Sequence, residues 1–396
     1  MRLFKDVPME IWAIGLVTLL INLSGVIIFF LSPFYLRSLG VGYNDLGVIE
    51  GVIEATSWIM RFISGFLTDF FHQRKPALLI AYSISAIARP VLIFLPGATT
   101  LMFSRMLDRI GNGIQASPRE ALIGDIAPLE LKGACFGLRQ SLSVIGSFVG
   151  AIFVWWIMRS TDGDYQSAFT LAAIPPVVAI FVLLFFVHEK PRLKEKYTPT
   201  LILILRELKH DLILLKKEYW ILIGFACLLM MSNFSGMFLA FKATNVGLSE
   251  ADAALVMIIQ NMMTAISAYP VGRWADTVDR RVPLAIGIVL VIFSNIILAI
   301  STTSIGVLFG VAIWGFQMGI LSSLIAVKIT DRTNINVRGT AFGLYYILVG
   351  ISLFLTNSLS GWIAENISLN AVFWSSAFYA FLSLLFVPFL ENKELR

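Results

Sequence analysis

Residues 65–75 read GFLTDFFHQRK, and residues 272–281 read GRWADTVDRR. Each stretch follows a long apolar run and carries a glycine, an aspartate four residues later, and then basic residues. The two glycines stand 207 positions apart. A second pair of similar stretches, KGACFGL from Lys132 and RGTAFGL from Arg338, stands 206 positions apart. Two matches at nearly one spacing indicate an internal repeat that divides the chain into two halves.

The composition is typical of a membrane protein. Of the 396 residues, 58% are hydrophobic and 14% are charged, whereas a soluble protein carries about 25% charged residues. A helix needs roughly 20 mostly apolar residues to cross a bilayer. We predict twelve such helices, over residues 10–37, 44–70, 75–95, 98–124, 133–158, 166–188, 218–245, 249–275, 283–303, 304–328, 338–365 and 369–390. The predicted fold class is an all-α integral membrane protein.

The distribution of Lys and Arg predicts the orientation, because basic loops stay in the cytoplasm. Basic residues gather in the connections at 72–75, 189–196, 276–281 and 328–338, and they are scarce in the alternate connections. This bias places both termini in the cytoplasm and accounts for the net charge of +5 without a nucleic-acid partner. The first apolar segment is too long for a signal peptide and lacks a cleavage site, so we expect a retained helix.

The longest polar interval divides the predicted helices into six and six. In this interval leucines alternate with lysines, which predicts a helix lying along the inner membrane surface. We therefore predict an N-terminal six-helix bundle over residues 1–188, a cytoplasmic linker over 189–217 and a C-terminal six-helix bundle over 218–396. Parallel six-helix repeats are typical of a large class of secondary transporters.

The pattern Gly-x-x-x-Asp-x-x-x-Arg-Arg resembles the signature loop of the major facilitator superfamily, and the resemblance covers essentially the whole chain. The second copy fits closely, whereas in the first copy Phe70, His72 and Gln73 stand where the family often has Arg, Gly and Arg. The resemblance implies two pseudo-symmetric six-helix bundles, alternating access and a cytoplasmic gate at these loops. The predicted gate residues are Gly65, Asp69, Arg74, Gly272, Asp276, Arg280 and Arg281, together with Arg119 and Arg139 near the cytoplasmic helix ends.

The stretch RMLDRIGNGIQASPRE at 105–120 places charge inside a predicted helix. Arg105, Asp108 and Arg109 share one helix face. A charge at that depth costs at least about 3 kcal/mol and normally faces a polar cavity or a partner. We expect Asp108 to pair with one of its two arginine neighbours.

Small residues follow this cluster. Gly111 and Gly113 permit close approach of another helix, and Pro118 breaks the helical hydrogen-bond ladder, which predicts bending. A basic residue on this helix resembles a feature common in the superfamily, where it takes part in substrate or proton coupling. The resemblance implies that role for Arg105 or Arg109.

Cationic groups outnumber acidic ones among the charges predicted inside the membrane, which favours an anionic substrate. The predicted substrate-binding residues are Arg105, Arg109, Asn22, Asn233, Lys242 and Gln317. The predicted proton-coupling acids are Glu54, Asp108 and Glu50. Among these we prefer Glu54, because it lies in an apolar stretch two turns from Arg61, whereas two arginines flank Asp108.

We therefore predict a proton-coupled secondary transporter of a small anionic organic solute in a bacterial-type inner membrane. An organic acid, a phosphate ester or a carboxylate siderophore would fit. Efflux by proton antiport is an alternative, although antiporters of the superfamily often carry a Gly-Pro pair where Gly146–Gly150 contains no proline. Sodium coupling and a non-transporting membrane receptor are further alternatives.

Other function classes find little support in the sequence. It contains no Gly-x-x-x-x-Gly-Lys loop for an ATP-driven pump and no evident nucleophile beside the arginine cluster, so an enzyme is not expected. The two cysteines lie in predicted helices and the three histidines in predicted loops, so neither a disulfide framework nor a bound metal is predicted. We expect a monomer without a cofactor, whose partners are the solute, protons and the lipid bilayer.

Overall fold

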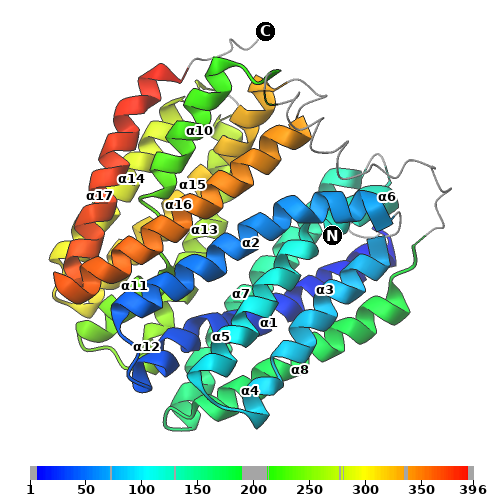
Figure 1. Cartoon of the computed structure of the whole chain (residues 1–396), viewed down its shortest axis with the longest axis horizontal. Helices are drawn as coiled ribbons and strands as arrows, with labels where there is room; N and C mark the ends of the chain where they lie inside the picture. The colour runs from blue at the N-terminus through cyan, green and yellow to red at the C-terminus, as the bar shows by residue number, and fades with distance from the viewer. Residues whose placement is uncertain are drawn as a thin grey trace. The chain divides into compact units, whose positions relative to one another are not determined.

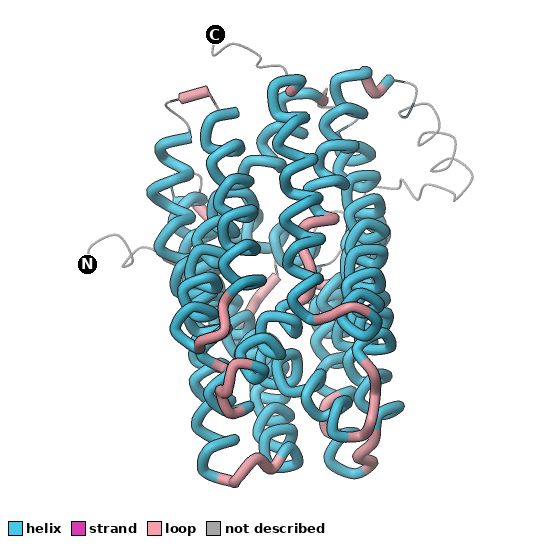
Figure 2. The backbone as a smooth tube through the Cα atoms, turned by 90° about the vertical axis from the view of Figure 1, so that its left-hand side faces the viewer, coloured by secondary structure: helices cyan, strands magenta, loops and turns pink. Residues whose placement is uncertain are grey.

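The computed structural model describes residues 7–71, 74–128, 131–189, 212, 214–275, 278–279, 281–333 and 338–390. Within these ranges it describes the backbone alone at 65–71, 133, 268–269, 272–273, 275, 322–327, 330–332 and 338–339. The described chain is nearly all helical, and no strand occurs in it (Figure 2). The predicted all-α fold class is confirmed.

Each predicted span corresponds to one helix or to two consecutive helices (Figure 1). The first half of the sequence forms α1 (Met9–Ser38), α2 (Tyr43–Phe71), α3 (Arg74–Ala88), α4 (Val91–Phe94), α5 (Ala98–Ile114), α6 (Ala116–Ile126), α7 (Lys132–Ser160) and α8 (Tyr165–Phe186). The second half forms α10 (Lys217–Met230), α11 (Gly236–Asn245), α12 (Glu250–Ala253), α13 (Leu255–Ala275), α14 (Arg281–Ile300), α15 (Ser304–Arg332), α16 (Arg338–Asn366) and α17 (Leu369–Phe386), which ends in a short 3₁₀ turn (Val387–Phe389). Within the described residues, eight helices are long and apolar enough to cross a membrane.

Four predicted spans are divided into two helices, where the sequence predicted continuous ones. The span 98–124 is interrupted at Gln115, because Pro118 has no N–H to donate to the Ile114 carbonyl. The span 218–245 is interrupted between Met230 and Gly236. The other two interruptions separate α3 from α4 and α12 from α13.

The chain forms two compact units, each built mainly by one half of the sequence. Unit 1 comprises the described part of residues 1–41, 56–196 and 250–254, and unit 2 comprises the described part of 42–55, 197–249 and 255–396. Residues 42–55, the first part of α2, therefore belong to unit 2, although they lie in the first half of the sequence. Residues 250–254 belong to unit 1, although they lie in the second half.

Glycines set the helix packing in unit 1, where α1 lies against α7 and α8 (Figure 1). A Cβ atom on Gly150 of α7 would stand 2.6 Å from the Leu23 carbonyl oxygen of α1, and one on Gly146 would meet the Leu19 carbonyl in the same way. Gly111 of α5 likewise lies against the Ala81 carbonyl of α3. The predicted role of small residues in close helix approach is confirmed at Gly111.

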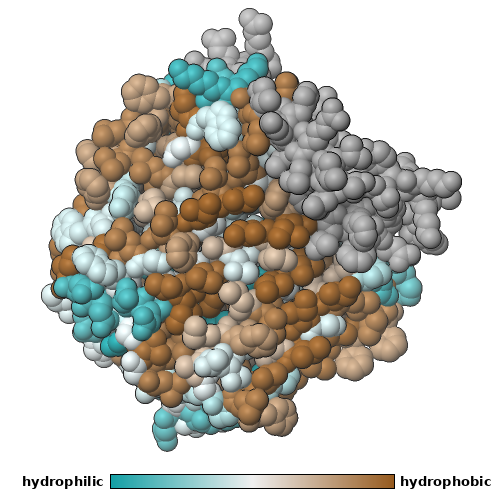
Figure 3. All heavy atoms as spheres, in the orientation of Figure 1, coloured by the Kyte–Doolittle hydropathy of each residue, from teal (hydrophilic) through white to brown (hydrophobic). Residues whose placement is uncertain are grey.

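The outer surface is apolar. Hydrophobic side chains cover most of the coloured face in Figure 3. Phe94, Ile305 and Phe389 are 78%, 82% and 69% exposed, which would be costly in water. These helices and this surface describe a multi-pass membrane protein.

Candidate functional site

The predicted arginine cluster forms on the face of α5 that meets α1. The Cζ atoms of Arg105 and Arg109 lie 5.8 Å and 5.5 Å from the centre of the Phe29 ring. Both guanidinium groups therefore gather at one aromatic side chain of α1, within cation–π distance. Arg105 is 3% exposed, so its charge is held inside unit 1.

Asp108 forms an ion pair with Arg89, an arginine outside α5 that the sequence analysis did not connect with it. The expected pairing with Arg105 or Arg109 stays a prediction. The Oδ1 atom of Asp108 lies 2.6 Å from Nη2 of Arg89, which directly follows α3, and its Oδ2 atom accepts a hydrogen bond of 3.2 Å from Asn112. Arg89 is 1% exposed and also donates to Ser24 of α1. This buried ion pair ties α1, α3 and α5 together.

The spacing of the sequence contains a signal for this pair. Arg89 and Asp108 stand at nearly equal distances from the polar turn at 95–100. In a helical hairpin, two residues at equal distances from the turn face each other. The positions of the two charges about the turn thus indicate the pairing, whereas the charge of Arg89 taken alone does not.

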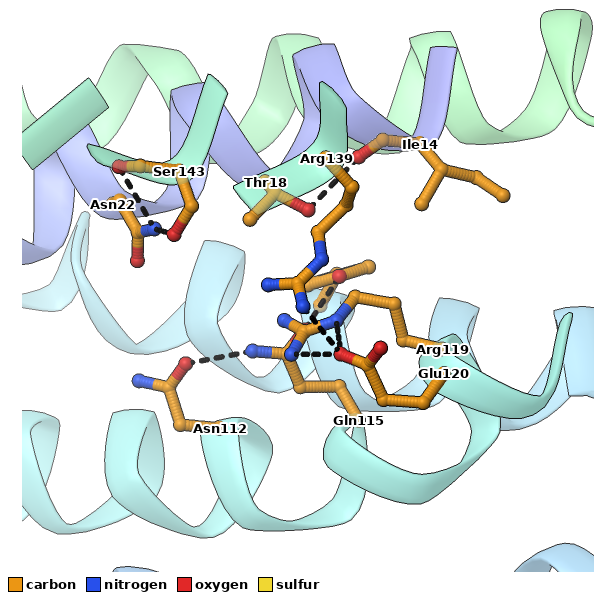
Figure 4. Close-up of polar contacts among 10 residues, drawn as sticks. Ile14, Thr18, Asn22, Asn112, Gln115, Arg119, Glu120, Arg139 and Ser143 are labelled. Atoms are coloured by element: carbon orange, nitrogen blue, oxygen red, sulfur yellow. Dashed lines mark hydrogen bonds and ion pairs between the residues drawn. The ribbon is translucent and has the colours of Figure 1, made fainter. Parts of the chain in front are cut away.

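Side-chain hydrogen bonds continue from Asp108 through Asn112 to the interruption of the helix. Figure 4 shows them from Asn112 onward. Gln115 donates to the Asn112 side chain at 2.9 Å. The Oε1 atom of Gln115 accepts from the Tyr82 hydroxyl at 2.5 Å and from Nη1 of Arg119 at 3.1 Å. One amide therefore connects α5, α3 and α6 where the backbone ladder is broken. No sequence pattern singled out Gln115, Asn112 or Tyr82 for a role.

Two of the predicted gate arginines meet at Glu120 (Figure 4). Its Oε1 atom accepts from Nη2 of Arg119 at 3.0 Å and from Nη2 of Arg139 at 2.9 Å. Arg139 extends from α7, and Arg119 and Glu120 belong to α6. Glu120 is absent from the residues predicted for any site, because its link to Arg139 depends on how α6 and α7 pack.

Asn22 takes part in helix packing in unit 1. Its amide donates to the Ser143 hydroxyl at 2.5 Å and to the Ser143 carbonyl at 3.3 Å, which joins α1 to α7 (Figure 4). Its predicted contact with substrate stays a prediction.

In unit 2 the polar site forms at the interruption between α10 and α11. Ser235 caps α11, and its N–H donates to Oδ1 of Asn357 at 2.7 Å. The Ser235 hydroxyl stands 3.5 Å from the carboxylate of Glu50, which is fully buried on the first part of α2. A discontinuous helix of this kind is where transporters commonly hold ions or polar groups. Glu54, one turn further along α2, is half-buried.

The other predicted residues of unit 2 lie in different surroundings. Asn233 is half-buried in the interruption itself. Gln317 is 2% exposed, and its Oε1 atom has no hydrogen-bond partner in the described part of the chain. It lies one turn from Trp314, which stacks on Phe234 with ring centres 4.8 Å apart. Lys242 donates to Asn370 of α17 at 2.6 Å, a residue outside the predicted binding set.

The signature loops are partly described. Only the backbone of Gly65, Asp69 and Gly272 is described, and Asp276 and Arg280 lie outside the described residues. Arg74 forms an ion pair with Asp125 of α6. The backbone N–H groups of Arg74 and Lys75 donate to the Glu189 carboxylate at 2.8–3.0 Å. Glu189 therefore caps the N-terminus of α3.

The second signature loop contains an ion pair within the loop itself. Arg281 binds Asp279, with Nη2 and Oδ2 2.7 Å apart. The hydrogen bond from the Arg281 side chain holds the pKa of Asp279 below its usual value. Arg281 therefore stabilises the charged form of a residue in its own loop.

Comparisons with known proteins agree with this architecture. The family model described as Major Facilitator Superfamily matches residues 14–241 and 220–395. An uncharacterised MFS-type transporter of Methanocaldococcus jannaschii is 23% identical over 394 residues, which cover 98% of this chain and 96% of that protein. The crystal structure of the nucleoside transporter NupG matches with a TM-score of 0.79 and 14% identity, covering 97% of this chain and 100% of that one. The crystal structure of a D-xylose-proton symporter matches with a TM-score of 0.74 and 16% identity, covering 96% of each chain.

The family match extends over nearly the whole chain, and its members that match here are transporters rather than enzymes. The protein is accordingly a secondary transporter that belongs to the Major Facilitator Superfamily.

Proposed function

We propose that the protein carries a small anionic organic solute and couples its movement to protons. Arg105 and Arg109 would bind the carboxylate or phosphate group of the solute. The observation that carries this proposal is the convergence of both arginines on Phe29 inside unit 1. Guanidinium groups bind such oxyanions through paired hydrogen bonds, and the ring gives them a fixed, partly desolvated position.

The pairing of Asp108 supports the same role. Its carboxylate contacts Arg89 and Asn112, which come from outside the Arg105–Arg109 pair. Three arginines, Arg89, Arg105 and Arg109, therefore lie near this single carboxylate. Positive charge exceeds negative charge at the site by simple count, which favours an anion.

Glu50 becomes the preferred coupling acid, ahead of Glu54 and Asp108. A coupling acid has to gain and lose a proton inside the membrane. Asp108 is held in an ion pair with the buried Arg89. Glu50 is completely buried and contacts a hydroxyl group at the start of α11, whereas Glu54 is half-buried. Protonation of Glu50 would change the contact between the first part of α2 and α11.

The membrane location follows the charge distribution. We propose a bacterial-type inner membrane with both termini in the cytoplasm, because the basic connections of the sequence alternate with nearly uncharged ones. In this orientation Arg119 and Arg139 lie toward the cytoplasm.

Ligand-dependent thermal stability of the purified full chain tests the substrate class. Anionic metabolites should raise the melting temperature and neutral analogues should not, because a ligand that binds the folded state stabilises it. Arg109→Lys retains the charge but loses the planar fork, and it should weaken binding by about tenfold.

Arg159→Lys is the matched control, since Arg159 is an exposed arginine at an end of α7. Unchanged affinity in Arg109→Ala would exclude the α5 site. Intact binding with no uptake or efflux in liposomes at any pH would favour a receptor over a transporter.

A further inference from the structure

Two arginines face a single carboxylate at the contact of α6 with α7 in unit 1. Arg119 and Arg139 both donate through Nη2 to the Oε1 atom of Glu120, at 3.0 Å and 2.9 Å. Because both nitrogens touch one oxygen, they stand no more than about 6 Å apart. Figure 4 shows the two guanidinium groups converging from different helices. This cluster carries one positive charge more than it carries negative charges.

The donors of these arginines exceed the acceptors around them. The Nε atom of Arg139 is buried and has no hydrogen-bond partner among the described residues. Arg119 donates through Nη1 to Gln115 and through Nε and Nη2 to Glu120. A guanidinium offers five N–H groups, and a buried donor without an acceptor is costly. The cluster therefore has a buried donor that would gain from a further acceptor, and one positive charge in excess.

The site is accessible from the side of Glu120. The Glu120 side chain is 39% exposed, whereas those of Arg119 and Arg139 are 15% and 13% exposed. An oxyanion that enters there would meet Nη2 groups close enough for one carboxylate or phosphate to contact both. Glu120 occupies the position that the oxygen of such an anion would take.

The neighbouring side chains connect this cluster to the first arginine site. Gln115 contacts Arg119 and Asn112, and Asn112 contacts Asp108. Arg109 lies on α5 and Arg119 on α6, ten positions apart and on opposite sides of the interruption at Gln115. The two arginine pairs are thus separate sites on one polar path.

We propose that Arg119 and Arg139 form a second subsite for a soluble oxyanion, in which the anion replaces Glu120 as the bridging acceptor. The identification of this oxyanion as the carboxylate or phosphate of the transported solute rests on the proposed function. Glu120 is then an internal competitor that releases the arginines when the solute arrives and takes them back when it leaves. If Arg119 and Arg139 served only as gate residues, a soluble anion would not compete with Glu120 for them.

Binding of radiolabelled sulfate to the purified full chain, at constant ionic strength, tests this subsite. Glu120→Gln removes the competing charge and should tighten sulfate binding about fivefold. Arg139→Gln should weaken it by about tenfold to hundredfold. Asp125→Asn is the matched control, because Asp125 is another acid of α6 that pairs outside this cluster, with Arg74. Unchanged sulfate affinity in both Glu120→Gln and Arg139→Gln would overturn the proposal.

Two further variants keep the result interpretable. Arg139→Lys retains the positive charge beside Glu120 and should still weaken binding, because the planar fork is lost. Sulfate binding that survives in Arg105→Gln/Arg109→Gln but disappears on adding Arg139→Gln would support the second subsite. Loss of all binding in Arg105→Gln/Arg109→Gln, with Glu120→Gln inert, would overturn this inference and leave the proposed function standing.

The converse pattern separates the two proposals in the other direction. Binding that depends on Arg139 and Glu120 but is insensitive to Arg105→Gln/Arg109→Gln would support the subsite and refute the α5 substrate site. A lipid headgroup has the same chemistry as a soluble phosphate, so the assay is repeated in vesicles with and without phosphatidylglycerol. Displacement of sulfate by this lipid would overturn the assignment to a soluble anion.

Discussion

Replacing Arg89 with methionine should destabilise the protein by about 3–5 kcal/mol, because this change removes a buried guanidinium that pairs directly with the Asp108 carboxylate. The Arg89 guanidinium lies 2.6 Å from Asp108 and is 1% exposed. Two unit charges about 4 Å apart interact by about 4 kcal/mol at an effective dielectric constant of 20. The Coulomb energy and the usual cost of breaking a buried pair therefore agree in size.

A double-mutant cycle separates this pair from general packing loss. Asp108→Asn in the Arg89→Met background removes the charge that Arg89 pairs with, so the double variant should be more stable than the sum of the two single losses predicts, by about 2 kcal/mol or more. The free energy of unfolding is measured by SDS titration in detergent micelles, followed by tryptophan fluorescence. Arg159→Met, whose side chain is 64% exposed in the native protein, is the control and should cost less than about 1 kcal/mol.

Additive losses in the cycle would refute this reasoning. They would mean that Arg89 stabilises the bundle through its contact with Ser24 or through packing alone. A loss of less than about 1 kcal/mol in Arg89→Met would refute it more directly, because breaking a buried ion pair is expected to cost more than this.

Three further outcomes follow from the structure. Glu50→Gln should abolish accumulation of solute driven by a pH gradient in liposomes while solute exchange persists, and Glu54→Gln should retain accumulation; the reverse pattern would make Glu54 the coupling acid. Gly150→Leu should destabilise the protein by more than about 3 kcal/mol, since a Cβ atom there meets backbone oxygen 2.6 Å away, and wild-type stability in an SDS titration would contradict this packing. Asp164→Ala should cost about 1 kcal/mol at pH 7, because Asp164 caps α8. The hydrogen bond from Ser167 lowers the pKa of Asp164, so its stabilisation is complete above about pH 4 and is lost as the pH falls through the lowered value; a deficit that persists at pH 2 would contradict the ionic part.

The length of the apolar runs predicted the helices well, because a bilayer sets the number of residues that a span needs. The same length criterion failed to predict where four of these spans are interrupted. The stretch from Ser232 to Gly236 reads SNFSG, and its serine and asparagine side chains compete with the backbone for hydrogen bonds. This short polar stretch is averaged away in an apolar window, although it begins α11 and holds the contact with Glu50.

The candidate site was predictable within one helix and not between helices. Arg105 and Arg109 were grouped correctly, because residues four apart share a helix face. The ion pair of Asp108 with Arg89 was missed, because partners were sought along α5 alone and not across the turn at 95–100. Lys242 shows the same limit, because its charge was evident from the sequence whereas its contact with Asn370 of α17 depends on packing.

The glycine contacts between α7 and α1 have a mechanical consequence. Where Gly146 and Gly150 lie against carbonyl oxygens of α1, the two helix backbones are too close to slide or rotate past each other without collision. These helices should therefore move as one rigid body when the transporter changes state. The distance between spin labels on α1 and α7 should be the same with and without solute. The distance between labels on α5 and α6, on either side of Gln115, should change if the helix bends there during transport.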